Sequence, residues 1–427
     1  MSRAANRICV LMIAYTNYQT DPRVIREAEA ALSAGFDVDF IALSRPGDPP
    51  QELIRGVRLI HLAQTRYRGG GVFSYMLSYL EFFFRCLLKI TWLQLEKRYR
   101  VVHVNNMPDF FVFCALLPKM MGAKVILDIH DPMPNTFASK FQKEENGLPY
   151  KLLLWEQQIS ASFADQVITV HDPIKDHVLV KQHQMSSASI KVIANFADDE
   201  LFTPRSPSQI DGRLRLAFHG TILERYGLRD AMHALAGMQH QDQITVKIIG
   251  EGDFSVQLNQ LIESLRLSQV VRFDNRMYPV EEIPRMLADC NLGLVPMEIS
   301  SITKYALPLK LLEYLSMGIP SITVRNTAVD YYFGEDDCLF YEPGNVESLR
   351  TLLDRLAVSP ELLRRYQQRA VVLREKFVWS REKQKYIALL NELAGRQQPE
   401  ARAACITYGL EGQAKHWCPD RERIMCA

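Results

Sequence analysis

The sequence predicts an α/β chain with two facing domains, each built on a parallel sheet. Short β-branched or apolar runs alternate with helical stretches, first from residue 8 to about 195 and again from 214 to about 341. Between the two series, residues 195–212 contain prolines, serines and acids without a sustained period, which indicates a linker. Because parallel sheets bind ligands beyond the carboxyl ends of their strands, the loops that follow the strands are the candidate sites.

Apolar runs bounded by turn residues mark the expected strands. In the first series these runs are 8–13, 38–42, 57–62, 101–104, 124–129, 167–170 and 190–193. In the second series they are 214–218, 245–249, 270–273, 292–295, 321–324 and 339–341. A last amphipathic helix is expected at 377–395. Beyond 397 the periodicity is lost, so we expect a disordered tail without a catalytic part.

Length, charge and cysteine pattern exclude several classes of protein. The chain of 427 residues is long enough for two ordinary domains. Lys and Arg total 50 against 49 for Asp and Glu, so the chain has no large net positive charge that would attract nucleic acid. The 8 cysteines show no Cys-x-x-Cys or zinc-like spacing, which is typical of reduced cytosolic thiols. A strand begins almost at once, leaving no room for a signal peptide, so we expect a cytoplasmic protein.

Residues 72–95 have the length of a membrane span but form an amphipathic helix, because Glu81, Arg85 and Lys89 make a polar stripe four residues apart. Two interpretations stay open. The helix covers the sheet of the first domain, or it contacts an anionic membrane as a peripheral enzyme does, at its inner face. The second interpretation draws on the basic residues that flank the helix, namely Arg66, Arg68, Lys97, Arg98 and Arg100.

Polar residues follow several strands of the first series. Asp21 and Arg23 follow the first strand and could face an acceptor substrate across the cleft between the domains. A helix N-cap explains Asp21 equally well. Asn106 and Asp109 follow the 101–104 strand and suit a hydroxyl-rich acceptor.

His130 comes directly after the 124–129 strand, close to Asp128 and Asp131 in the sequence. Burial of these three titratable side chains is costly in free energy unless they serve a site. His130 is the catalytic candidate, and the alternative is a structural histidine bonded to neighbouring backbone.

In the second series, the stretch TKYALPLKLLEYLSMGIP at 303–320 organises the domain. A helix is expected from about Leu309, with Pro308 at its start. Lys310 and Glu313 stand three residues apart on one helical face, which supplies a cation for phosphate beside a carboxylate for sugar hydroxyls. A surface salt bridge is the simpler interpretation of such a pair.

A second candidate for a phosphate-binding segment is the loop after the 214–218 strand, with sequence HGTILERYG. Gly220 allows close approach of a ligand to the backbone next to Thr221. Arg225 offers a bidentate fork to phosphate oxygens.

The 303–320 stretch resembles the donor-binding signature of retaining glycosyltransferases of family 4 (group 1), in which a Glu, seven residues, Glu pattern grips the nucleotide sugar. Glu313 matches the second Glu of that pattern, and Tyr305 stands where the first would be. The Pro-x-Lys-x-x-Glu-Tyr run is similar to a variant in members that build bacterial surface polysaccharides. In similar enzymes a His at the position of His130 contacts the donor sugar, and an Arg or Lys precedes the glycine that starts the helix after Arg225.

The resemblance implies the two-domain GT-B fold and sugar transfer, with retention, from a nucleotide donor such as a UDP- or GDP-sugar to a glycan or lipid-linked hydroxyl. It implies no metal and no cofactor, and the base and the sugar stay open. The expected domains are an acceptor-side Rossmann-like domain at 1–200, a nucleotide-sugar domain at 201–376, a helix at 377–396 that crosses back onto the first domain, and the tail at 397–427. A nucleotide-sugar epimerase of the same fold and an inactive nucleotide-binding scaffold are the alternatives.

Overall fold

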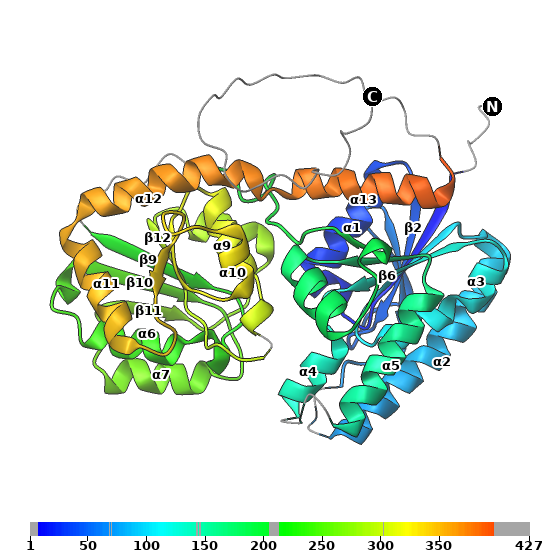
Figure 1. The fold of residues 1–427 in the computed structure, drawn as a ribbon, viewed down its shortest axis with the longest axis horizontal. Helices are drawn as coiled ribbons and strands as arrows, with labels where there is room; N and C mark the ends of the chain where they lie inside the picture. The colour runs from blue at the N-terminus through cyan, green and yellow to red at the C-terminus, as the bar shows by residue number, and fades with distance from the viewer. Residues whose placement is uncertain are drawn as a thin grey trace, which may run out of the picture.

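The computed structural model describes residues 7–67, 69, 71–141, 144, 147–204, 213–301 and 303–396. Two sheets form two halves that lie side by side (Figure 1). The expected α/β class with two facing parallel sheets is confirmed. The first sheet ends at Val192 and the second begins at Leu214, so the expected boundary at residue 200 falls between them. The expected tail, Arg68 and residues 205–212 of the linker lie outside the described residues.

The first sheet has the strand order β3-β4-β2-β1-β5-β6-β7-β8, and only the pair β3 and β4 is antiparallel. Its strands are β1 Cys9–Ile13, β2 Asp37–Leu43, β3 Gln51–Ile54, β4 Val57–Leu62, β5 Val101–Asn105, β6 Lys124–Ile129, β7 Gln166–Thr169 and β8 Ile190–Val192. The chain changes direction across the sheet between β1 and β5. A ligand crevice is expected at such a switch point, outside the carboxyl ends of the strands.

Helices cover both faces of the first sheet, which is why its central strands β1 and β5 are almost wholly buried. They are α1 Pro22–Ser33, α2 Val72–Lys97, α3 Leu116–Met120, α4 Met133–Lys140 and α5 Leu148–Phe163, with the short helices η2 Asp109–Ala115 and η3 Ile174–Gln182. Alternate residues of β1 face opposite cores. Val10 and Met12 pack in the core that contains α1 residues, and Leu11 and Ile13 pack in the core that contains α2 residues.

One strand escaped the sequence analysis. β3 is only 4 residues long and pairs antiparallel with β4 through the turn at Arg55 and Gly56, whose φ angles are 48° and 89°. Its alternation of exposed and half-buried residues is too short to stand out from a loop. The glycine turn just before β4 was the available signal, since two adjacent left-handed residues favour a hairpin.

The second sheet has the order β11-β10-β9-β12-β13-β14 and is parallel throughout. Its strands are β9 Leu214–His219, β10 Ile244–Ile249, β11 Val271–Asp274, β12 Leu292–Val295, β13 Ser321–Val324 and β14 Leu339–Tyr341. The helices are α6 Leu228–Ala236, α7 Ser255–Ser264, α8 Ile283–Met286, α9 Leu309–Ser316, α10 Thr327–Tyr332 and α11 Val346–Val358. The switch point of this sheet lies between β9 and β12, so the loops after these two strands adjoin its crevice.

The chain ends with α12 Pro360–Leu373 on the second half and α13 Trp379–Ala394 on the first, which confirms the expected crossover (Figure 1). Tyr386, Leu389 and Leu390 of α13 are buried in the core of the first half. At the crossing, the Trp379 N–H donates to the carbonyl of Ala197 at 3.0 Å.

Arg26 of α1 stabilises the same junction. Its guanidinium donates to the Phe196 carbonyl at 2.6 Å and lies 5.1 Å from the ring centroid of Trp379. The linker and the last helix are therefore held to α1 at one place.

Helix α2 forms where an amphipathic helix was expected. It buries Phe82, Cys86, Ile90 and Leu93 against the sheet, which confirms that it covers the first half. Among the described residues, no helix combines the length and the hydropathy that crossing a bilayer requires.

Candidate active site

A pocket of about 180 Å³ lies between the two halves, at the carboxyl ends of their strands. The first half contributes Arg23, His130, Asp131, Pro132, Asn135, Thr136, Val170, His171, Ile174 and Val178, the linker contributes Asn195, and the second half contributes Ser301, Tyr305, Ala306 and Leu307. Four residues singled out in the sequence, Arg23, His130, Asp131 and Tyr305, are thereby brought together. The donor-side candidates of the second half do not line this pocket, namely Gly220, Thr221, Arg225, Lys310 and Glu313.

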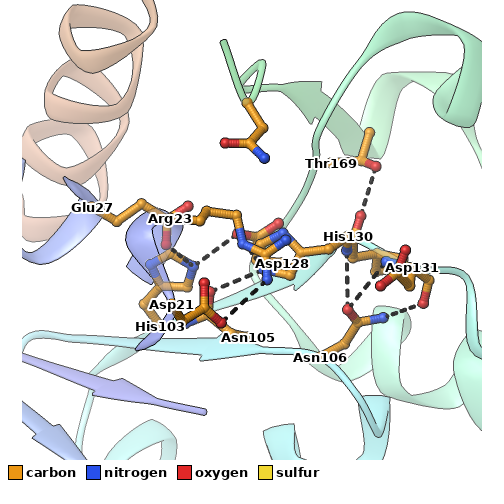
Figure 2. Close-up of polar contacts among 12 residues, drawn as sticks. Asp21, Arg23, Glu27, His103, Asn105, Asn106, Asp128, His130, Asp131 and Thr169 are labelled. Carbon is orange, nitrogen blue, oxygen red and sulfur yellow. Dashed lines mark hydrogen bonds and ion pairs between the residues drawn. The ribbon is translucent and has the colours of Figure 1, made fainter. Parts of the chain in front are cut away.

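His130 is a neutral imidazole in the pocket wall (Figure 2). Its backbone N–H donates to Oδ1 of Asn106 at 3.0 Å. Nε2 lies 3.1 Å from Oδ1 of Asn105 and 3.2 Å from Oδ2 of Asp128, whereas the buried Nδ1 has no hydrogen-bond partner among the described residues. Burial lowers the pKa of His130 well below its ordinary value, and Arg23 and His103 act in the same direction. The ring therefore stays uncharged at neutral pH.

Behind His130 lies a buried polar cluster made of Glu27, His103 and Asp128 (Figure 2). Nε2 of His103 lies 3.5 Å from Oδ2 of Asp128 and 4.0 Å from Oε2 of Glu27. Nδ1 of His103 is 2.7 Å from the hydroxyl of Tyr386 on α13. Burial raises the pKa of Glu27 to about 8, with Asp128 adding to the effect, and burial raises the pKa of Asp128 to about 7. With both pKa values raised by burial, the two carboxyls can share one proton at neutral pH.

The same three residues form a group that could reach a metal ion. Their ligand atoms lie within 4.8 Å of one another. However, the positive charge of Arg23 acts on Glu27, His103 and Asp128 alike, so a divalent cation there would face a guanidinium. A proton shared by the Glu27 and Asp128 carboxyls lowers the negative charge of the cluster without this repulsion.

Arg23 and Asp21 stand at the start of α1, after the first strand. Asp21 occupies the N-cap position, but its side chain accepts no capping hydrogen bond, so the cap interpretation does not account for it. Its carboxylate lies 3.9 Å from the guanidinium of Arg23. The buried Nε of Arg23 has no hydrogen-bond partner within the described part of the chain, which leaves a donor at the pocket for a ligand.

Asn106 and Asp109, the other acceptor-side candidates, do not line the pocket. The Asn106 amide donates to Oδ1 of Asp109 at 3.0 Å and to the carbonyl of Asp131 at 2.8 Å. Asp109 is fully buried and also accepts from Gln157 of α5 at 2.9 Å. Burial raises the pKa of Asp109 to about 6. This geometry supports a structural role, in which the pair fixes the loop that carries His130.

In the second half, the loops after β9 and β10 touch backbone to backbone. Gly220 has a φ of 100° and Gly250 a φ of 147°. A Cβ on Gly250 would lie 1.8 Å from the Gly220 carbonyl oxygen, and one on Gly252 would lie 2.2 Å from the Ile222 oxygen. The Gly-x-Gly run after β10 therefore shapes the Gly220 loop, which the sequence alone did not distinguish from an ordinary turn.

Lys310 reaches this loop from the first turn of α9. Its Nζ lies 3.8 Å from the ring centroid of Phe218 and 4.5 Å from that of Tyr226. A Cβ on Gly220 would be 3.9 Å from the same Nζ. No carboxylate of the described residues makes an ion pair with Lys310, and burial lowers its pKa to about 7.

Arg225 also lies near the Tyr226 ring. Its guanidinium lies 5.5 Å from the Tyr226 ring and makes no ion pair with any residue that the structure describes. The Arg225 carbonyl accepts from the Glu298 N–H at 2.9 Å, which ties this loop to the one after β12. Thr221 is exposed on the same loop. Gly220, Thr221, Arg225 and Lys310 thus meet at the switch point of the second sheet.

Glu313 is buried one turn after Lys310. Burial raises its pKa to about 7, while Arg26 and Lys310 act in the opposite direction. Oε2 of Glu313 lies 3.3 Å from Nε2 of His219, a residue at the end of β9 whose pKa burial lowers to about 3. The simpler interpretation, a surface salt bridge between Lys310 and Glu313, is therefore wrong, because Glu313 is buried.

Tyr305, which stands where the resembling signature has its first Glu, joins the halves. Its hydroxyl accepts from Gln182 at 3.2 Å, and its ring stacks on His177 at 6.0 Å. The sequence analysis did not identify Arg26, Glu27 and His219 as residues of the site. Arg26 and Glu27 stand three and four residues after Arg23 on one helix, and this spacing was the available signal for them. For His219 the signal was its position directly before Gly220.

Two family models match consecutive parts of the chain. Residues 23–201 match Glycosyltransferase Family 4, and residues 202–371 match Glycosyl transferases group 1. A stretch of 162 residues, 37% of this chain, is 28% identical to an exopolysaccharide phosphotransferase of Streptomyces coelicolor, and the match spans 16% of that protein's length.

Solved structures of several glycosyltransferases share the two-half fold. Sucrose-phosphate synthase from Thermosynechococcus elongatus has a TM-score of 0.73 at 15% identity, over 91% of this chain and 100% of that chain. HepE of Anabaena in complex with UDP and glucose has a TM-score of 0.64 at 14% identity, over 90% and 100%. WaaG, a glycosyltransferase involved in lipopolysaccharide biosynthesis, has a TM-score of 0.65 at 15% identity, over 89% and 99%. At these identities the likeness establishes the GT-B fold.

The close approach of Gly250 to Gly220 predicts the effect of one added methyl group. Gly250→Ala should lower the free energy of unfolding by about 1–3 kcal/mol, because the new Cβ forces the two backbones apart and the φ of 147° disfavours an L residue. Urea denaturation measures this. The control is Gly334→Ala, whose Cβ would sit 3.6 Å from Oδ2 of Asp337 without backbone strain. Equal stabilities of the two variants would contradict the packing of these loops.

Proposed function

Because the chain belongs to the glycosyltransferases of group 1 and family 4, with a GT-B fold, we propose that it transfers a sugar from a nucleotide-sugar donor to a hydroxyl acceptor with retention at the anomeric carbon. The observation that carries the proposal is Lys310, a half-buried residue beside Gly220 that makes no ion pair with a described residue, although the charge of Glu313 acts on it. A ligand phosphate would supply an anion in direct contact with the ammonium group.

The donor diphosphate would bind at the switch point of the second sheet. Lys310 and Arg225 offer two basic groups near the Tyr226 ring, and Gly220 allows the ligand to approach the backbone. Charge builds up on the leaving diphosphate as the glycosidic bond breaks, and fixed cations stabilise it. We therefore expect transfer to proceed without a metal ion.

Glu313 and His130 would orient the two ends of the sugar nucleotide. The carboxylate of Glu313 can accept hydrogen bonds from ribose hydroxyls. The unpartnered Nδ1 of His130 can accept one from the donor sugar across the pocket. The titles of the HepE structures name UDP, glucose and UDP-glucose as the molecules bound to that protein, which supports a nucleotide-sugar donor here.

The acceptor would enter from the first half, where Arg23 contributes an unpartnered donor and Asp21 lies beside it. The relatives named for exopolysaccharide and lipopolysaccharide synthesis support a glycan or lipid-linked acceptor in cell-surface polysaccharide or glycolipid synthesis.

Removing either donor-side group should slow transfer. Glu313→Ala and Arg225→Ala are each expected to lower the transfer rate at least ~10²-fold, as for the loss of one transition-state partner. The assay is sugar transfer from a panel of UDP-, GDP- and dTDP-sugars, with and without a lipid-linked acceptor.

Matched controls are Arg229→Ala and Glu361→Ala, which remove exposed residues paired with Glu224 and Arg364. Unchanged kinetics in the donor-side variants would remove both residues from the site. Release of free sugar in the absence of acceptor would instead indicate an epimerase, and no binding of UDP or GDP in calorimetry would indicate a scaffold.

A cytoplasmic enzyme with a lipid-linked acceptor would work at the inner face of the membrane, and α2 offers a surface for that contact. Its outer side exposes an apolar stripe at helical spacing, made of Phe73, Met76, Leu77, Leu80, Phe84, Leu88, Trp92 and Leu95. Helix α5, which packs with α2 on η2, exposes Leu148, Leu152, Trp155 and Ile159. Exposed apolar side chains in such a row mark an interaction surface.

Charge favours an anionic bilayer over a second protein as the occupant. Lys89 and Lys140 lie over aromatic rings of α2, at 5.9 Å from Trp92 and 3.8 Å from Tyr75, and neither makes an ion pair with a described residue. Lys97 and Arg98 follow at the end of the helix. Apolar and aromatic side chains with lysines alongside are typical of helices that lie in the membrane interface.

Two charges in the stripe should abolish this binding. The double variant Phe84→Glu and Leu88→Glu is expected to lose co-flotation with vesicles that contain phosphatidylglycerol, while its sugar-transfer rate to a soluble acceptor analogue stays the same. Val256→Glu, an equally exposed apolar position on α7, should still float. If the wild-type protein does not float, or if light scattering shows a dimer that the double variant dissociates, the stripe serves another partner.

A further inference from the structure

His130 has two ring nitrogens with opposite surroundings, and this asymmetry determines what it can bind. Nε2 faces two oxygens, Oδ1 of Asn105 at 3.1 Å and Oδ2 of Asp128 at 3.2 Å. The Asn105 amide is oriented because its Nδ2 donates to the Ile13 carbonyl at 3.4 Å, which leaves Oδ1 toward the histidine. Two acceptors on one side are satisfied only if Nε2 carries the proton.

We propose that Asp128 is a positioning residue: it holds the proton of His130 on Nε2 and thereby presents Nδ1 to the pocket as a hydrogen-bond acceptor for a hydroxyl group of the sugar. The inference rests on the transfer function proposed above, and it specifies the chemistry of that wall of the pocket. A hydroxyl donates to Nδ1, whereas an anionic oxygen has no proton to give.

The imidazole cannot readily adapt to an anion by taking up a second proton. The ring is almost fully buried, and Arg23 and His103 add to the effect of burial in lowering its pKa. A charged imidazolium at this place would need a compensating anion, and Asp128 already serves His103 as well as His130.

Glu27 keeps Asp128 available as an acceptor. Burial raises the pKa of both carboxyls, and a hydrogen bond from protonated Glu27 to Asp128 lets the pair share one proton while Asp128 stays an acceptor. The groups that face this pair are Arg23 and Asp21 of α1, His103 of β5, His130 after β6 and Tyr386 of α13. The Tyr386 hydroxyl is hydrogen-bonded to Nδ1 of His103 at 2.7 Å, and Nε2 of that ring lies 3.5 Å from Oδ2 of Asp128.

Isosteric variants separate the two carboxyls. Asp128→Asn can present an amide N–H to Nε2, which would move the proton of His130 to Nδ1, and we expect kcat/KM to fall at least ~10-fold with UDP affinity unchanged. Glu27→Gln imitates the protonated carboxyl but cannot lose a proton, so it isolates the contribution of that proton to the pH dependence of kcat/KM.

The pH profile adds a readout that a structural role would not move. Loss of the shared proton above the pKa of about 8 places a second negative charge in the cluster, so wild-type kcat/KM should fall above pH ~8. Glu27→Gln should lack this alkaline fall. A fall that persists unchanged in Glu27→Gln would overturn the assignment of the shared proton.

The tautomer itself is measured in the ligand-free protein by long-range ¹H–¹⁵N spectroscopy on histidine-labelled samples, with the His130 signals assigned by their loss in His130→Gln. We expect Nε2–H with an unprotonated Nδ1 in the wild type, and a shift toward Nδ1–H in Asp128→Asn. An Nδ1–H or doubly protonated ring in the wild type would overturn the proposal. This measurement needs no turnover, so it can fail while sugar transfer is confirmed, or hold while transfer is absent.

Discussion

A lysine packed against two aromatic rings is the constraint on which the second half depends. Lys310 rests on the rings of Phe218 and Tyr226, and the described residues provide it with no ion pair. Cation–π contacts of this kind contribute roughly 0.5–2 kcal/mol each, which offsets only part of the cost of desolvating an ammonium group. Folding alone does not require such a residue. An anion bound beside Gly220 would recover the remaining cost, which is why the position favours a phosphate ligand.

Each sheet gathers polar residues at its own switch point, and local contacts hold them there. In the second half, the Tyr314 hydroxyl donates to the Ala217 carbonyl at 2.7 Å and so holds α9 against β9. In the first half, α1 carries Arg23 toward the pocket and Arg26 toward the linker. The charge of Arg26 also acts on Glu313, so one helix of the first half influences the donor side of the second.

The strands and the donor-side residues could be predicted because their signals are local. Apolar runs marked every strand except the short β3, and Lys310 and Glu313 followed from one stretch of sequence. The acceptor side was harder, since the partners that decide it are distant in the chain. Asp109 is buried by Gln157, 48 positions away, and His103 is bonded to Tyr386, 283 positions away. Whether a polar residue after a strand is free or satisfied depends on such contacts, and no periodicity reveals them.

Proton uptake on nucleotide binding tests the role of Lys310 most directly. Burial lowers its pKa to about 7, so at pH 8 the free amine is mostly neutral, and a bound diphosphate would raise the pKa and draw in a proton. Calorimetry with UDP at pH 8, in two buffers of different ionisation enthalpy, should give an uptake approaching about one proton per UDP bound. The uptake should vanish in Lys310→Met and persist in Glu313→Gln. Binding of UDP without proton uptake, or with the same uptake in Lys310→Met, would contradict a phosphate site at this lysine.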